Sequence, residues 1–382
     1  MARKRKLLFF ATEDWYFVAH RLGLACAAID AGYEVAVATR VNKHARAIGD
    51  AGVKLLTLNW HRGSLNPLRL QGEVREIRDF INDELPDIVH CVSLRTIVAT
   101  CMALHGLPRQ RAVMAFTGLG YLFVGNQLWK RLARKFVGAA IKGAAREHHI
   151  VLLFENADDR DTILKLVKVD VETEVNPGSG VNTDRFTTLP PPDNPVPVFA
   201  FAGRILRIKG IEELVRASLQ LDARGLEHEV LLAGPLDEQN RSGISKIQLD
   251  TLLRDSPVRW IGEVGDVRAL WARVDVAVGP SHGGEGVPLA LVEAAACARP
   301  LIGSDVPGCR DIVRNAETGL LVPPRDVKAL AEAMTILARN ASVREMYGKK
   351  AAEVARNEFS QGEVTSRTFA LYDRLMEKSA GG

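Results

Sequence analysis

The sequence predicts an α/β fold built from two doubly wound domains, each with a parallel sheet covered by helices. Short apolar runs alternate with helix-length segments along almost the whole chain, which is the pattern of parallel sheets. The chain has 382 residues, 47% of them hydrophobic. That is too long for one ordinary core and fits two domains of roughly 180 residues. We therefore expect two Rossmann-like domains facing a cleft.

Five apolar runs predict the strands of the first domain. They are residues 6–10, 34–38, 53–58, 87–91 and 112–116. No G-x-G-x-x-G follows any of them, which argues against a dinucleotide-dependent dehydrogenase. The basic residues at the start resemble the opening of a signal peptide, but Glu13 and Asp14 interrupt the apolar run too early. The first run is therefore predicted to be a strand.

A proline-rich connector at residues 189–197 separates the two predicted domains. We place the boundary near residue 190, giving domains 1–190 and 191–357 and a final helical segment 358–382. Strand patterns in the second domain fall at residues 198–202, 229–233, 258–261, 274–278, 301–303 and 320–322.

The stretch 279–300 organises the second domain, because it places two carboxylates around a glycine-rich turn at a helix start. Pro288 suits the first helical position, so Glu285 stays in the loop while Glu293 lies about one turn into the helix. Both could then line one crevice beyond the strand's carboxyl end, where open α/β sheets bind ligands. Spacing alone is a weak signal, since two such glutamates are more often a surface loop residue and a solvated helix position.

The same helix start offers uncovered backbone amides near Gly286 and Val287, which suit a phosphate group. A carboxylate does not bind phosphate. Carboxylates beside a phosphate site therefore indicate a ligand that also carries hydroxyls, which a nucleotide-sugar does.

The whole stretch resembles the signature of retaining glycosyltransferase family 4. The resemblance is closest to bacterial capsule, O-antigen and lipid-linked oligosaccharide enzymes, which read Glu-Gly-Leu-Pro where this chain has Glu285-Gly-Val-Pro288. It implies the GT-B fold, with the donor mostly in the second domain, the acceptor mostly on the first, and the last helix crossing back to the first domain. It also implies sugar transfer with retention of configuration and without a metal or other cofactor.

Two cations, Arg204 and Lys209, follow the first strand of the second domain in a segment that resembles the family's Gly-Arg-Leu-x-x-x-Lys-Gly. The resemblance assigns them to the donor diphosphate, where positive charge stabilises the departing group. With Glu285 they form the predicted catalytic set. By resemblance Glu285 meets the donor sugar and Glu293 the ribose. The predicted donor-binding residues are Arg204, Lys209, Glu285, Gly286, Val287, Pro288 and Glu293.

By the same resemblance four positions in the first domain are predicted to contact the acceptor: Asp14, Trp15, Arg62 and Gly118. Trp15 fits the buried start of the next helix equally well, and the loop around Arg62 fits a plain turn. Gly118 stands where many family 4 enzymes carry a histidine near the donor sugar, so one customary side chain is missing.

Residues 129–146 contain six basic residues and no acidic one, with apolar residues at helical spacing. A basic amphipathic helix is typical of an anionic membrane surface. The alternative is a helix packed by its apolar stripe with a solvated basic face. The formal charge of the whole chain is only +4, which does not indicate nucleic-acid binding.

A second acidic pair, Asp159 and Asp161, has the D-x-D spacing of metal-dependent glycosyltransferases. It follows Asn156, a natural helix cap, so we expect it at a helix start and expect no metal there. Five cysteines without a C-x-x-C pair indicate a reducing compartment. No apolar run reaches the roughly 18 residues that span a bilayer, so we expect a cytoplasmic protein, peripheral on the inner face of the plasma membrane.

The expected function is therefore a retaining hexosyl- or N-acetylhexosaminyl-transferase. It would move a sugar from a nucleotide-sugar, expected to be a UDP-sugar, to a lipid-linked saccharide in bacterial surface polysaccharide synthesis. Two alternatives stay open: a nucleotide-sugar 2-epimerase of the same fold, and an inactive scaffold in a membrane biosynthetic complex. Arg204, Lys209 and the two glutamates argue against the scaffold, which has no need of all four.

Overall fold

The computed structural model describes residues 3–60, 67–125 and 127–377. The chain divides into two compact units, one formed by Met1–Ser179 with Gln361–Gly382 and the other by Gly180–Ser360. Both are α/β units with parallel sheets, which confirms the predicted fold class. The boundary expected near residue 190 falls inside the second unit. The last helix, α15 (Gln361–Glu377), belongs to the first unit.

In the described residues the first unit has a seven-stranded parallel sheet in the order β3-β2-β1-β4-β5-β6-β7. The strand order reverses between β1 and β4, which makes their carboxyl ends the switch point of this unit. All five strands predicted for this half are present. The bounds are β1 (Lys6–Glu13), β2 (Glu34–Arg40), β3 (Lys54–Thr57), β4 (Ile88–Val92), β5 (Arg111–Phe116), β6 (His149–Phe154) and β7 (Glu172–Val175).

Helices cover both faces of this sheet because successive strand residues point to opposite sides. In β1, Leu8 and Phe10 pack toward α4 (Pro67–Glu84), α5 (Leu94–Leu104), α6 (Leu128–Glu147) and α7 (Ala157–Val167). Leu7 and Phe9 pack toward α1 (Asp14–His20), α2 (Leu22–Asp30), α3 (Ala45–Asp50) and α15.

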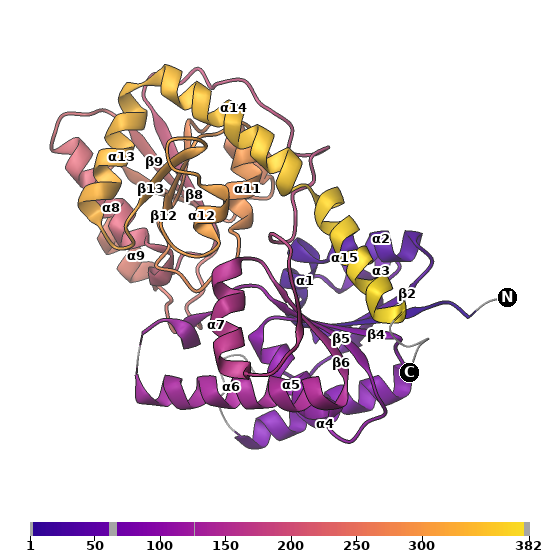
Figure 1. Ribbon diagram of the computed structural model, residues 1–382. Helices are drawn as coiled ribbons and strands as arrows, with labels where there is room; N and C mark the ends of the chain where they lie inside the picture. The colour runs from indigo at the N-terminus through magenta and orange to yellow at the C-terminus, as the bar shows by residue number, and fades with distance from the viewer. Residues whose placement is uncertain (1–2, 61–66, 126, 378–382) are drawn as a thin grey trace. The chain divides into compact units, whose positions relative to one another are not determined.

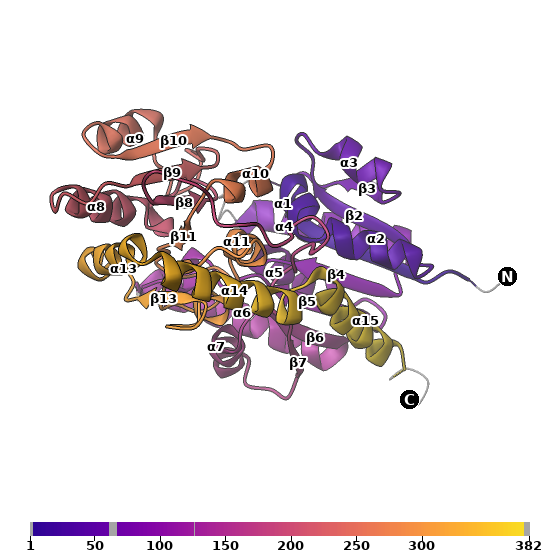
Figure 2. The same cartoon turned by 90° about the horizontal axis from the view of Figure 1, so that it is seen from above.

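Helix α15 is anchored on the sheet of the first unit and lies beside α2 (Figures 1 and 2). The hydroxyl of Tyr372 on α15 lies 2.6 Å from Nδ1 of His90 on β4, and both side chains are fully buried. Burial lowers the pKa of His90 well below its usual value, which keeps the imidazole neutral in the core.

The second unit has a six-stranded parallel sheet in the order β10-β9-β8-β11-β12-β13, with its switch point between β8 and β11. The strands that were predicted here are all present. They are β8 (Val198–Ala202), β9 (Glu229–Ala233), β10 (Val258–Gly262), β11 (Val276–Gly279), β12 (Leu301–Ser304) and β13 (Gly319–Val322).

Two sets of helices cover this second sheet. One face carries α8 (Ile211–Asp222), α9 (Lys246–Leu253) and α13 (Val327–Arg339), of which α8 and α13 lie side by side (Figures 1 and 2). The other carries α10 (Val267–Ala272), α11 (Leu289–Ala296), α12 (Cys309–Ile312) and α14 (Ala341–Glu358). None of the helices in the described part of the chain is both long and apolar enough to cross a membrane.

Candidate active site

The predicted donor residues lie at the switch point of the second unit, where the loops after β8 and β11 meet. Gly210 ends the first of these loops at φ +75°, a conformation that favours glycine. A Cβ there would lie 2.0 Å from the carbonyl oxygen of Pro280 in the second loop. The amide of His282 also donates to the carbonyl of Ile208 over 2.8 Å. The loop that carries Lys209 therefore rests directly on the loop that carries Glu285.

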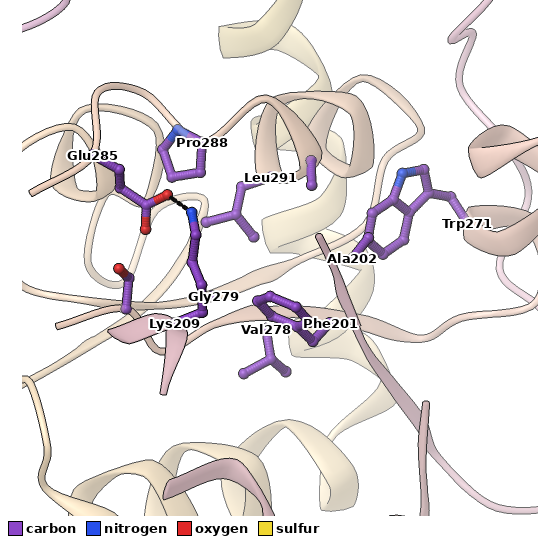
Figure 3. A pocket seen from close by; sticks show the side chains of 11 residues that line it. Phe201, Ala202, Lys209, Trp271, Val278, Gly279, Glu285, Pro288 and Leu291 are labelled. Atoms are coloured by element: carbon purple, nitrogen blue, oxygen red, sulfur yellow. Dashed lines mark hydrogen bonds and ion pairs between the residues drawn. The ribbon is translucent and has the colours of Figure 1, made fainter. Parts of the chain in front are cut away.

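Lys209 and Glu285 form an ion pair between these two loops (Figure 3). Their side chains are 23% and 19% exposed and line a cavity with Pro288, Leu291 and Trp271. The cavity volume is about 30 Å³, which is room for roughly one or two water molecules and far less than a sugar. The ion pair thus lies at the position predicted for the donor.

Arg204, the other predicted cation, belongs to the same loop as Lys209. Its Nη1 donates to Oδ2 of Asp237 over 2.8 Å, and Asp237 is only 8% exposed. Reasoning from the sequence did not single out Asp237. Its position soon after the carboxyl end of β9 was the signal that could have identified it.

A second residue that the sequence did not reveal is His282. Its Nε2 lies 3.0 Å from Oε1 of Glu213 on α8, and both side chains are mostly buried. This pair ties the loop after β11 to the helix that follows Lys209. It adds a side-chain contact to the backbone contacts between the two loops.

Helix α11 begins one residue later than the sequence predicted, but the two glutamates lie on either side of its start as expected. Pro288 occupies the N-cap, Glu285 lies in the loop before it and Glu293 lies inside the helix. Gly308, at φ +80°, passes so close to this loop that a Cβ would lie 2.1 Å from the carbonyl oxygen of Gly286. The loop after β12 therefore supports the backbone of Gly286 and Val287 from the side.

Glu293 is the fifth residue of α11 and is partly buried. Burial raises the pKa of its carboxyl to about 7, and the positive charge of Arg185 acts in the opposite direction. Among the described residues, Glu285 lines the cavity beside Lys209 and Glu293 does not. The two carboxylates thus occupy separate positions around the same helix start.

Three glycines bring the ends of β8, β9 and β10 close together beside this site. Gly234 has φ +136°, and a Cβ on it would lie 2.0 Å from the carbonyl oxygen of Gly203. The amide of Gly234 donates to the carbonyl of Gly262 over 2.7 Å. The carboxyl ends of these three strands therefore contact one another beside the predicted donor residues.

Asp14 is the one predicted acceptor residue that the structure reassigns. Its side chain is completely buried and accepts the backbone N–H groups of Trp15, Asn42 and His44 at 2.7, 2.6 and 2.9 Å. Burial alone would raise the pKa of Asp14, but these hydrogen bonds outweigh it and lower the pKa. The carboxylate therefore holds the loop after β2 against α1 and is not available for direct contact with an acceptor.

The other predicted acceptor positions stay predictions. Trp15 is partly buried at the start of α1, and its ring meets that of Tyr16 edge to face at 5.7 Å. Gly118 is buried at φ +89°, where a histidine or any other side chain would be strained. Arg62 lies outside the described residues.

The D-x-D segment lies at a helix start, as the sequence predicted. The side chain of Asn156 caps α7 by accepting the amide of Asp159 over 2.8 Å, and its Nδ2 donates to Oδ2 of Asp159 over 3.1 Å. These contacts explain Asp159 as part of a helix cap.

Solved structures show which fold this chain has. Sucrose-phosphate synthase from Thermosynechococcus elongatus is 21% identical and superposes with a TM-score of 0.79, over 98% of this chain and 100% of that chain. Alr3699/HepE from Anabaena, solved with UDP and glucose, is 16% identical with a TM-score of 0.75, over 97% of this chain and 99% of that chain. The fold is that of GT-B glycosyltransferases.

Family models then place the chain within that class. The model described as "Glycosyl transferases group 1" matches residues 196–340, and the one described as "Glycosyl transferase 4-like" matches residues 6–147. The chain belongs to the group 1, family 4-like glycosyltransferases, which confirms the resemblance found in the sequence.

Two curated relatives are bacterial glycosyltransferases. The capsular polysaccharide biosynthesis glycosyltransferase CapM of Staphylococcus aureus is 30% identical over 184 residues, which are 48% of this chain and 48% of CapM. The chain thus matches about half the length of that relative. The N,N'-diacetylbacillosaminyl-diphospho-undecaprenol alpha-1,3-N-acetylgalactosaminyltransferase of Campylobacter jejuni is 23% identical over 360 residues, covering 90% of this chain and 92% of the relative.

Proposed function

We propose that this protein transfers a hexosyl or N-acetylhexosaminyl group from a UDP-sugar to a lipid-linked saccharide, with retention of configuration and without a metal ion. The observation that carries the proposal is the ion pair of Lys209 with Glu285 beside Arg204, at the switch point of the second unit. Two cations and a carboxylate at one edge of a sheet suit a ligand that has both a diphosphate and sugar hydroxyls.

The donor would replace the internal ion pair. Its diphosphate would bind to Lys209 and Arg204. The positive charges of these residues would stabilise the negative charge that builds on the departing nucleoside diphosphate. Glu285, released from Lys209, would accept hydrogen bonds from hydroxyls of the donor sugar. Glu293 would accept hydrogen bonds from the ribose. Cations at the diphosphate would supply the charge that a bound metal supplies in other transferases.

A lipid-linked acceptor is supported by the Campylobacter relative, whose name gives its acceptor as a sugar on diphospho-undecaprenol. A UDP donor is supported by the neighbouring fold of Alr3699/HepE, which was solved with UDP. We propose that the same kinds of substrate serve this chain in bacterial surface polysaccharide synthesis.

Helix α6 suggests where the reaction takes place. Four large apolar side chains on it are exposed by 42–71%, namely Leu128, Trp129, Leu132 and Phe136. A neighbouring stripe of the same helix carries cations at spacings of four and seven residues, namely Arg131, Lys135, Lys142 and Arg146. Apolar and basic stripes side by side suit the interface of an anionic bilayer. We propose that α6 holds the protein on the inner face of the plasma membrane.

The structure corrects one part of the membrane hypothesis. Lys130 was expected to meet lipid headgroups, but it is 1% exposed. Its Nζ donates to the carbonyl of Val124 over 2.6 Å and lies 3.4 Å from the centre of the Tyr121 ring. Arg134 is half-buried, and its Nε donates to the carbonyl of Leu122 over 3.0 Å. These two cations hold the segment before α6 and are not part of the exposed basic stripe.

The proposed function is tested with purified protein, a panel of nucleotide-sugars and a lipid-linked monosaccharide diphosphate. We expect release of UDP that requires the acceptor, and a product whose new linkage keeps the anomeric configuration of the donor by NMR. Conversion of the donor without any acceptor would instead support the epimerase. No turnover together with no nucleotide binding would support the scaffold. Lys209→Ala serves as the inactive control.

A further inference from the structure

We infer that the loop after β9, residues 234–243, positions the donor-binding cations, and that Asp237 is the residue through which it fixes Arg204. This inference rests on the proposed donor site and adds to it a carboxylate that does not touch the donor itself. Asp237 is thus assigned as a positioning residue. The assignment depends on how the loop is joined to the segment that carries Arg204 and Lys209.

The backbone of the loop follows that of the cation-bearing segment. Ile205 donates its amide to the carbonyl of Pro235 over 3.0 Å, and Arg207 donates its amide to the carbonyl of Ser242 over 2.8 Å. The amide of Ile208 donates to the hydroxyl oxygen of Ser242, also over 2.8 Å. Both ends of the loop therefore hold the short segment between the two predicted donor cations.

The three cations of this segment have different partners, and Arg207 has a structural role. Its guanidinium donates to Oε1 of Gln248 over 2.8 Å, to Oε1 of Glu212 over 3.2 Å and to the carbonyl of Gly243. Arg207 therefore holds α8, α9 and the loop after β9 together. Arg204 and Lys209 flank it and point to the site residues Asp237 and Glu285 instead.

The burial of the two side chains indicates that Asp237 positions Arg204. The carboxylate is almost fully buried while the Arg204 side chain is 34% exposed, so the fixed partner is the acid and the accessible partner is the cation. A guanidinium has its five N–H donors in a rigid plane, so the bond from Nη1 to Asp237 constrains the orientation of the whole group. The loop thereby holds the guanidinium of Arg204 at the proposed donor site, where a guanidinium suits a phosphate.

A competing explanation is that Asp237 only masks Arg204 and repels the diphosphate. The two explanations differ when the hydrogen bond and the negative charge are removed separately. Asp237→Asn keeps an oxygen that can accept from Arg204 but removes the charge, whereas Asp237→Ala removes both. Asp250→Ala is the matched control, because Asp250 is an ion-paired carboxylate of the same unit that pairs with Lys246.

The experiment compares binding of UDP and of uridine to these variants by calorimetry and records Tm for each. Positioning predicts that Asp237→Ala binds UDP about tenfold more weakly and uridine unchanged, because only UDP carries the diphosphate. Asp237→Asn should bind UDP at least as well as wild type, and Asp250→Ala should match wild type. The inference is overturned if Asp237→Ala binds UDP as tightly as wild type or more tightly. It is also overturned if the affinity for uridine falls as much as the affinity for UDP.

Two further variants keep the result interpretable. If Asp237→Ala does not fold, Asp237→Ser takes its place, since the serine hydroxyl is too short to reach Arg204. Arg204→Ala separates this inference from the proposed function. If Arg204→Ala binds UDP more weakly and Asp237→Ala does not, only the positioning role of Asp237 is rejected. If Arg204→Ala binds UDP as well as wild type, the proposed donor site itself is rejected.

Discussion

Lys209 and Glu285 form an ion pair that joins the loops after β8 and β11. The two residues are 76 positions apart in the sequence, and the backbone contact at Gly210 brings them together. Each of the two residues balances the charge of the other. In the proposed mechanism the diphosphate of the donor binds Lys209, which separates the pair and leaves Glu285 for the donor sugar.

The first prediction concerns Gly210, whose Cβ would clash with Pro280. Gly210→Ala should impair UDP binding and lower the free energy of unfolding, because it combines a positive φ with a backbone clash. Gly225→Ala is the matched control, since Gly225 has φ +68° and no atom within 4 Å of the added methyl group. Both variants should lose about 1–3 kcal/mol for the strained φ, and Gly210→Ala should lose about 1–3 kcal/mol more. Equal losses in the two variants, measured by urea unfolding, would show that the loops are not in close contact.

The second prediction concerns the pH dependence of nucleoside binding. Burial raises the pKa of Glu293 from its ordinary 4.5 to about 7, and the ionised form is the better acceptor for ribose hydroxyls. Uridine affinity should therefore fall as pH drops through 7, by up to about tenfold one pH unit below the pKa. Glu293→Gln should be insensitive to pH over the same range. An NMR titration with uridine avoids the protonation of phosphate, and the same pH dependence in Glu293→Gln would assign it to another group.

The raised pKa of Glu293 also has a consequence for stability. Because the folded pKa lies above the unfolded one, the carboxyl contributes its full stability below about 4.5, and this contribution is lost as pH rises through 7. Glu293→Gln should thus gain stability over wild type near pH 8 and lose that advantage near pH 4, as followed by Tm.

The third prediction concerns the exposed face of α6. The protein should sediment with anionic vesicles and be released by high salt, because screening weakens the basic stripe. Leu132→Ser with Phe136→Ser should weaken binding to vesicles without changing uridine affinity. Ile336→Ser is the matched control, since Ile336 on α13 is exposed by 47%, as Phe136 is. Equal binding to neutral vesicles, or no binding to either kind, would show that α6 is a packed helix without a role at an anionic membrane.

The fourth prediction concerns metal. If Arg204 and Lys209 supply the positive charge at the diphosphate, turnover should persist in EDTA. Activity that is lost in EDTA and restored by manganese would contradict the metal-independent mechanism. Asp159→Asn, which alters a helix cap, should then affect Tm and leave turnover nearly unchanged.

The strands could be predicted because parallel strands are buried on both faces and appear as continuous apolar runs, such as Val198–Ala202. The loop position of Glu285 and the helical position of Glu293 could be predicted because Pro288 marks the helix start. Both features depend on residues that are neighbours in the sequence.

Contacts between distant segments could not be predicted in the same way. The family resemblance assigned Asp14 to the acceptor, but its carboxylate accepts hydrogen bonds from the amides of Asn42 and His44, which lie in another loop. Helical spacing identified α6 but did not show that Lys130 turns inward to the Val124 carbonyl. The position of Asp237 soon after β9 indicates the binding edge of the sheet, but it does not show that this carboxylate contacts Arg204.

We propose that Lys209, Glu285 and Glu293 surround one nucleotide-sugar, with Glu293 at the ribose and Glu285 at the sugar. Calorimetric titration of UDP into wild type, Glu285→Gln and Glu293→Gln tests it most directly. A charge-assisted hydrogen bond contributes roughly 1.5–3 kcal/mol, or about ten- to a hundredfold in affinity. Glu293→Gln should lose that much for UDP, while Glu285→Gln binds UDP nearly as well as wild type and loses kcat instead. Loss of UDP binding in Glu285→Gln with none in Glu293→Gln would contradict this placement of the two carboxylates.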